Sequence, residues 1–135
     1  MTTINLRKFL KMCDTDLSSL LSAMFTGNPY AIDAKYAADY YKVRQDLKEG
    51  KFKDDEYGPC LEDIFAEMLS KGMTLVFTDP DGKEHDVTLD DVGRGLDALI
   101  DKAPCAFADF IKGEEDAITG MNFLDCIIFG DVVYC

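Results

Sequence analysis

The sequence predicts a mostly helical α+β fold, with about six or seven short helices and a small antiparallel β-hairpin. Apolar residues recur at helical spacing in several separate windows, which predicts amphipathic helices. One pair of short β-prone segments flanks a turn that contains proline and glycine, which predicts the hairpin. The chain has 135 residues, of which 47% are apolar, and is long enough to bury a core. We expect a single domain over residues 1–135.

Three helices with apolar stripes are predicted in the first part of the chain. They cover residues 4–12, a segment that begins after Asp14 or Thr15, and residues 31–48. The second helix is expected to end at residues 27–29, Gly-Asn-Pro, because glycine and proline both interrupt helical backbone. The third helix is the longest predicted element.

Residues 51–59 are mostly polar and contain a Gly-Pro pair, which predicts a loop. The sign of the charge changes at this loop. Residues 1–53 carry nine Lys/Arg and six Asp/Glu, a net charge of +3, whereas residues 54–135 carry five and twenty, a net charge of −15. The whole chain has a net charge of −12.

A helix and the hairpin follow this loop. Residues 61–69 place their apolar side chains in one helical stripe. The strands of the hairpin are expected at about 73–78 and 83–88. The turn between them is Asp-Pro-Asp-Gly at 79–82, in which proline presets φ and glycine supplies the left-handed conformation.

Three more helices and a strand are predicted after the hairpin. One helix opens at Thr88 and closes near Pro104, a short one lies around 107–111, and a buried one covers about 120–129. A strand at 131–134 is expected to pair with the hairpin, since an isolated hairpin is only marginally stable.

Charge and composition argue against several classes of function. A net charge of −12 disfavours direct binding of nucleic acid or of an anionic membrane, because both attract positive charge. No run of about 18 apolar residues predicts a transmembrane helix. Five widely spaced cysteines without a C-x-x-C pair indicate reduced thiols, and we expect a cytoplasmic location. The sequence sets no oligomeric state.

Two motif-like segments are explained by local structure. Residues 93–98 fit the letters of the dinucleotide fingerprint G-x-G-x-x-A, but no apolar parallel strand directly precedes Gly93. We interpret the glycines as sites of close helix packing. Residues 79–82 lack the glycine position of a calcium loop and are interpreted as the hairpin turn. We therefore expect neither a cofactor nor a bound metal ion.

His85 is the single histidine of the chain, and acidic residues flank it on a predicted strand. We expect its ring to face solvent. A nucleophilic Cys-His pair with Cys60, Cys105 or Cys126 stays open as an alternative, because folding brings residues together that lie far apart in the sequence.

The candidate partner-binding residues are carboxylates of the acidic part of the chain. Twenty carboxylates match the charge of about ten base pairs, at one phosphate per roughly 1.7 Å of duplex. An acidic array of this size can imitate a nucleic acid, although the sequence leaves open whether its members share one face. The candidates are Asp54, Asp55, Glu56, Glu62, Asp63, Glu67, Asp90, Asp91, Asp97 and Asp101.

Three hypotheses of function follow. The leading one is a non-catalytic acidic protein that binds a basic protein partner, in its narrowest form a nucleic-acid-mimicking inhibitor of a DNA- or RNA-handling protein. By composition alone the chain resembles small acidic inhibitors of the phage or mobile-element type. The alternative is a structural or adaptor module that binds through tail residues such as Phe123, Ile127 and Phe129. The third hypothesis is a small cysteine-dependent enzyme.

Overall fold

The computed structural model describes residues 5–25 and 29–134, and within these ranges it contains seven helices and a three-stranded antiparallel sheet. This architecture confirms the predicted mostly helical α+β fold. In chain order the elements are α1 (Leu6–Met12), α2 (Leu17–Phe25), β1 (Ala31–Ala34), α3 (Ala37–Glu49), α4 (Leu61–Ser70), β2 (Leu75–Thr78), β3 (Glu84–Val87), α5 (Leu89–Lys102), α6 (Pro104–Lys112) and α7 (Ala117–Phe129).

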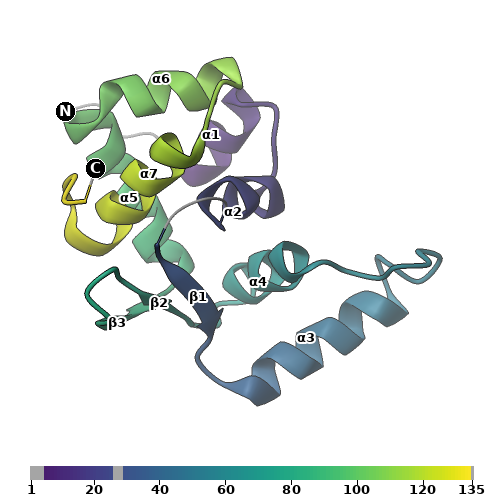
Figure 1. Cartoon of the computed structure of the whole chain (residues 1–135). Coiled ribbons are helices and arrows are strands. Elements are labelled where there is room, and N and C mark those ends of the chain that lie inside the picture. The colour runs from purple at the N-terminus through teal and green to yellow at the C-terminus, as the bar shows by residue number, and fades with distance from the viewer. Residues whose placement is uncertain (1–4, 26–28, 135) are drawn as a thin grey trace.

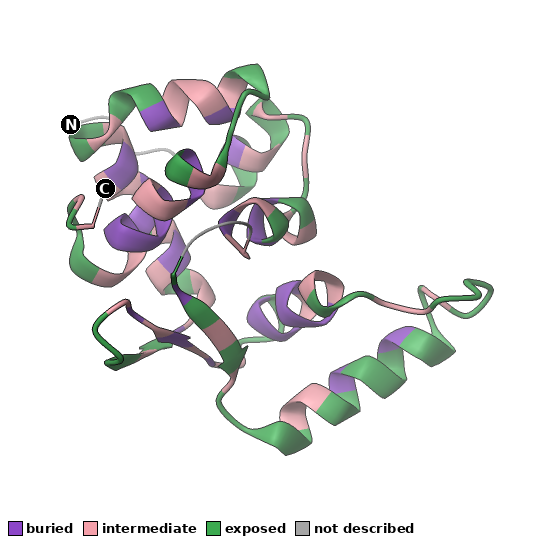
Figure 2. Cartoon of the chain, viewed as in Figure 1, coloured by how far each residue is buried: buried purple, intermediate pink, exposed green. Residues whose placement is uncertain are grey.

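The helices form one large group and a smaller outer layer. In Figure 1, α1, α2, α5, α6 and α7 are grouped together, α3 lies at the far side of the molecule, and α4 lies between α3 and that group. Figure 2 shows that α3 is exposed along most of its surface, and its buried residues are Val43 and Leu47. This helix is therefore held by a narrow apolar stripe, which packs on α4.

The sheet has β2 at its centre, with β1 and β3 antiparallel to it on either side. The hairpin of β2 and β3 was predicted, and Phe77 pairs with His85 within it. Burial alternates along β2, as expected for a half-buried strand: Leu75 and Phe77 are buried, whereas Val76 and Thr78 are partly exposed.

The third strand is β1, and the prediction of a strand at 131–134 was wrong. In the structure residues 131–134 form no strand, and the buried carboxylate of Asp125 accepts hydrogen bonds from the backbone amides of Val133 and Tyr134. Residues 31–34 were predicted as the start of a helix. They are extended because they pair with the free edge of β2, and tertiary pairing outweighs the helix propensity of their two alanines.

Several other predicted boundaries shift by a few residues. The predicted first helix, at 4–12, is observed from Leu6, after Asn5 caps it by accepting a hydrogen bond from the Lys8 amide. Ile4 and the predicted helix stop at Gly27-Asn28 lie outside the described residues, as does Cys135.

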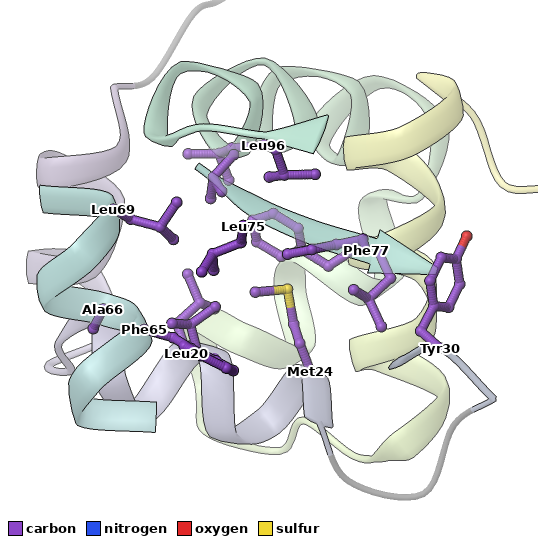
Figure 3. Packing of buried hydrophobic residues seen from close by; sticks show 14 of the residues in the cluster. Leu20, Met24, Tyr30, Phe65, Ala66, Leu69, Leu75, Phe77 and Leu96 are labelled. Atoms are coloured by element: carbon purple, nitrogen blue, oxygen red, sulfur yellow. The ribbon is translucent and has the colours of Figure 1, made fainter. Parts of the chain in front are cut away.

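The core is centred on β2. Figure 3 shows Leu75 and Phe77 lying among side chains from three helices. These neighbours are Leu20 and Met24 of α2, Phe65 and Leu69 of α4, and Leu96 of α5. Each large apolar side chain of this kind stabilises the fold by about 1.5–3 kcal/mol when fully buried. Packing around β2 therefore joins α4 to α2 and α5.

The first helix is anchored by a separate aromatic cluster. The ring of Phe9 is fully buried and lies 5.6 Å from Phe107, 5.9 Å from Phe110 and 6.3 Å from Phe123, measured between ring centroids. Edge-to-face and offset arrangements at these distances are favourable. The cluster fixes α1 against α6 and α7.

The second glycine of the 93–98 segment marks a close approach of two helices. A Cβ atom at Gly95 would lie 2.7 Å from the Cα atom of Ile127, so α5 and α7 touch backbone to backbone at this point. Gly93, one half-turn away, faces open space. The interpretation as a helix-packing site therefore holds for Gly95 and not for Gly93.

These two glycines give a matched test of the packing. Gly95→Ala should lower the free energy of unfolding by about 1–3 kcal/mol, because the added methyl group overpacks the contact with α7. Gly93→Ala should raise it by up to about 1 kcal/mol, because alanine is the better helix former and the site has room. Urea denaturation of both variants and the parent chain measures the difference. Equal effects at the two positions would contradict the close approach.

Candidate binding groove

The surface carries two adjoining hollows beside the start of α2. The larger, here called the apolar pocket, has a volume of about 490 Å³ and lies between α1 and α5, with Leu17 of α2 and Ser70 of α4 on its wall. The smaller, called the polar pocket, has a volume of about 150 Å³ and lies among α2, α3, α4 and the loop after α3. Leu17 and Ser70 line both hollows, so the two adjoin, and together they are called the acidic groove.

Carboxylates predominate among the charged residues of the acidic groove. Among the described residues, five carboxylates and two cationic side chains line it. The carboxylates are Asp16, Asp63, Glu67, Asp90 and Asp97, and the cations are Arg7 and Lys51. The groove is therefore an electronegative concavity, and the low-dielectric walls of such a hollow focus the field of its charges.

Helical spacing explains why carboxylates of the same helix line the acidic groove together. Asp90 and Asp97 are seven residues apart on α5, a spacing that places both side chains on the same face. Asp63 and Glu67 are four residues apart on α4 and are neighbours for the same reason. Asp16 precedes the first residue of α2 and accepts a hydrogen bond from the Ser19 amide at 2.8 Å, as a helix cap does.

Some of the groove carboxylates already have partners within the chain. Asp63 accepts hydrogen bonds from the Ser18 hydroxyl at 2.7 Å and from the Cys60 amide at 2.9 Å. The Ser19 amide holds the pKa of Asp16 below its usual range, because it stabilises the ionised carboxylate. Glu67 lies 4.0 Å from the ammonium of Lys71, a partly exposed pair of little energetic weight.

Asp97 differs from the other groove carboxylates. Its Oδ1 atom is buried and has no hydrogen-bond partner among the described residues. A buried polar atom without a partner costs roughly 1–3 kcal/mol, and more when it carries charge. Asp97 also lies on the wall of the apolar pocket, so its carboxylate contributes negative charge there.

The structure brings four of the ten predicted carboxylates together in the groove: Asp63, Glu67, Asp90 and Asp97. The other six lie elsewhere. Asp54, Asp55 and Glu56 are exposed in the loop between α3 and α4, Glu62 is partly buried on α4, Asp91 caps α5 and pairs with Arg94, and Asp101 is exposed near the end of α5. The ten residues therefore do not form one compact cluster.

Sequence reasoning missed Asp16 and the apolar walls of the groove. An Asp three residues before Ser19, at the start of a leucine-rich helix, is a recognisable capping signal for Asp16. No such local signal exists for Leu6, Leu10 and Leu89, because their side chains meet only when α1 packs on α5.

A second polar cluster lies at the other end of the molecule, around Asp125 of α7. Asp125 is fully buried, and its carboxylate accepts hydrogen bonds from the Tyr30 hydroxyl at 2.8 Å and from the amides of Val133 and Tyr134 at 3.0 and 2.8 Å. The Tyr134 hydroxyl donates to Asp81 at 2.6 Å. These bonds, called the Asp125 clamp, fasten the segment after α7 to α7 itself and to the hairpin turn.

His85 belongs to this end of the molecule and is more enclosed than expected. Its Nε2 atom lies 2.8 Å from Oδ2 of the buried Asp79, and its ring packs edge-on against Phe129. The side chain is 20% exposed, so the prediction of a solvent-facing ring was wrong. The reason is that the end of α7 lies against the outer strand β3, which the sequence does not show.

The cysteines do not assemble with this histidine in the described part of the chain. Burial raises the pKa of Cys13, and it raises the pKa of Cys126 to about 11. Thiols shifted in this direction are weaker sources of thiolate at neutral pH. Cys60 and Cys105 are exposed, and the polar partner of His85 is Asp79.

The described residues offer neither a cluster for a metal ion nor a helix that could span a membrane. Within residues 5–25 and 29–134, no group of three or more His, Cys, Asp or Glu side chains is arranged to hold a metal ion. In the same part of the chain, no helix has the length and apolar character needed to cross a membrane.

Comparison of the chain with protein-family models, curated proteins and solved structures finds no match. Function is therefore inferred from the geometry of this chain alone.

The Asp125 clamp predicts how stability responds to alkaline pH. Burial and the bond to Asp125 raise the pKa of Tyr30, and the bond to Asp81 and burial raise the pKa of Tyr134 to about 12. An unfolded tyrosine ionises near pH 10. The stabilisation is thus fully present below pH ~10 and is lost as the pH rises through the folded pKa.

We expect the free energy of unfolding to fall from about pH 10 upward, and to fall less steeply in Tyr134→Phe, which removes one of the two shifted phenols. Urea denaturation at a series of pH values measures the slope. Tyr57→Phe is the matched control, because Tyr57 is 90% exposed. A Tyr134→Phe profile parallel to that of the parent chain would contradict this account of the clamp.

Proposed function

We propose that this chain is a non-catalytic binding protein that receives a basic segment of a partner protein in the acidic groove. The observation that carries the proposal is that Asp16, Asp63, Glu67, Asp90 and Asp97 line two adjoining hollows. Three separate stretches of the sequence supply these carboxylates. A concave surface of this charge suits a protruding lysine- or arginine-bearing loop or helix better than a flat surface does.

The charge of the whole molecule supports the same function. A net charge of −12 exceeds the magnitude of roughly 2–8 that serves a small domain for colloidal stability alone. The electric field of this charge raises the rate at which a basic partner encounters the groove, and the effect weakens as salt screens the charges.

The narrower form of the proposal is nucleic-acid mimicry, in which the partner is a DNA- or RNA-handling protein and this chain inhibits it. The exposed Asp54, Asp55 and Glu56 extend the negative surface along the loop whose Lys51 and Phe52 line the polar pocket. Competition between the chain and duplex DNA for the same partner distinguishes mimicry from ordinary binding of a basic protein.

The adaptor alternative receives less support from the tail residues named for it. Phe123 is fully buried, and Ile127 packs against Gly95 of α5. Phe129 is 40% exposed but contacts the rings of His85 and Tyr134. These side chains contribute mainly to the fold, so they do not present a free apolar surface.

The proposal predicts that groove carboxylates matter more than equal charge elsewhere. The groove triple Glu67→Gln, Asp90→Asn, Asp97→Asn removes three negative charges from the acidic groove. The control triple Glu84→Gln, Glu114→Gln, Asp131→Asn removes three from exposed positions outside it. The parent chain and each triple are immobilised separately and used to capture partners from nuclease-treated lysate at low salt. Bound protein is then eluted by salt or by duplex DNA.

We expect the parent chain and the control triple to retain a basic protein that high salt releases. The groove triple should retain at least about tenfold less, since the loss of even one charge-assisted contact costs about 1.5–3 kcal/mol. Release of the same protein by duplex DNA supports mimicry. Equal loss of capture in both triples, or capture that is indifferent to salt, would count against the groove as the binding site.

A further inference from the structure

The apolar pocket has the size and composition of a small-molecule site. Its volume of about 490 Å³ lies within the range of roughly 300–1,000 Å³ that is typical of ligand pockets. Four leucines supply its apolar walls, and its charged residues are two carboxylates and one arginine: Leu6, Leu10, Leu17, Leu89, Asp90, Asp97 and Arg7. Such pockets bind ligands through apolar contact, and a few polar groups select among them.

The polar groups of this pocket favour a cation. Asp97 and Asp90 both line the pocket, seven residues apart on α5, and no described residue donates a hydrogen bond to Oδ1 of Asp97. Arg7 also lines the pocket, but it forms no ion pair with either carboxylate in the described part of the chain. Both carboxylates would repel an anionic ligand, and a neutral apolar ligand would cover these carboxylates without offering them a hydrogen-bond donor.

We propose that the apolar pocket binds a small organic cation, namely an ammonium or guanidinium group attached to an apolar aliphatic or aromatic body. The apolar body packs among the leucines of α1, α2 and α5. The cationic group donates hydrogen bonds to Asp97, with Asp90 contributing to the attraction. This binding activity goes beyond the capture of a basic protein partner, because its ligand is a free small molecule.

Gly93 provides a direct way to close the pocket. It lines the pocket, and a Cβ atom added to it would meet nothing within 4 Å. A large side chain at this position can therefore enter the space without displacing backbone. Gly93→Phe should fill the pocket while the rest of α5 keeps its packing against α7.

The test uses two probes that differ in charge and share an apolar body, phenylbutylammonium and phenylbutyrate. Binding to the isotope-labelled chain is followed by NMR through the backbone amide shifts of Leu10, Leu89 and Gly93. The variants are Asp97→Asn, which keeps the shape of the side chain and removes its charge, and Gly93→Phe. Glu84→Gln is the control for loss of one charge outside the pocket, and unchanged amide shifts far from the pocket show that each variant is folded.

We expect the ammonium probe to shift the pocket amides and to bind at least about tenfold more tightly than the carboxylate probe. Asp97→Asn should weaken it by about tenfold, in line with the loss of a charge-assisted hydrogen bond. Gly93→Phe should abolish binding, and Glu84→Gln should leave it unchanged. Equal binding of both probes, full binding by either pocket variant, or no response to the ammonium probe would overturn the proposal. Because the apolar pocket is part of the acidic groove, capture of a basic protein by each variant is measured separately, and failed probe binding with normal capture would overturn only the small-molecule proposal.

Discussion

The close approach of α5 to α7 at Gly95 is the constraint on which the rest of the structure depends. Backbone contact between these helices fixes the rotation of α5 about its own axis. That rotation sends Leu96 into the core around β2 and presents Gly93, Asp90 and Asp97 to the pocket beside α1. The packing of one face of α5 therefore determines the chemistry offered by the opposite face.

Some acidic residues of this chain cap helices, others line the acidic groove, and Asp16 and Asp63 do both. Asp63, Asp91 and Asp116 accept backbone hydrogen bonds at the starts of α4, α5 and α7, so part of the charge is used to satisfy helix ends. Asp90 and Asp97 lie on the wall of a hollow and have no such local role. A count of carboxylates does not separate these roles, whereas their positions on the helices do.

Local pattern predicted the helices and the hairpin, because each has an apolar period or a turn motif of its own. It failed at the third strand of the sheet. Ala31–Ala34 is extended because it pairs with β2, and the segment at 131–134 forms no strand because the amides of Val133 and Tyr134 donate hydrogen bonds to Asp125. The groove was beyond reach for the same reason. Asp16, Glu67 and Asp97 come from three distant stretches, and only tertiary packing sets their separation.

The short sheet also bears on how copies of this chain behave when crowded together. Its edge strands β1 and β3 have four residues each and carry Asp33, Glu84 and Asp86. Edge-to-edge pairing of two molecules would align these carboxylates against one another, and short charged edges are a known protection against β-aggregation. The acidity on which the proposed binding depends therefore also disfavours edge-to-edge pairing of identical sheets.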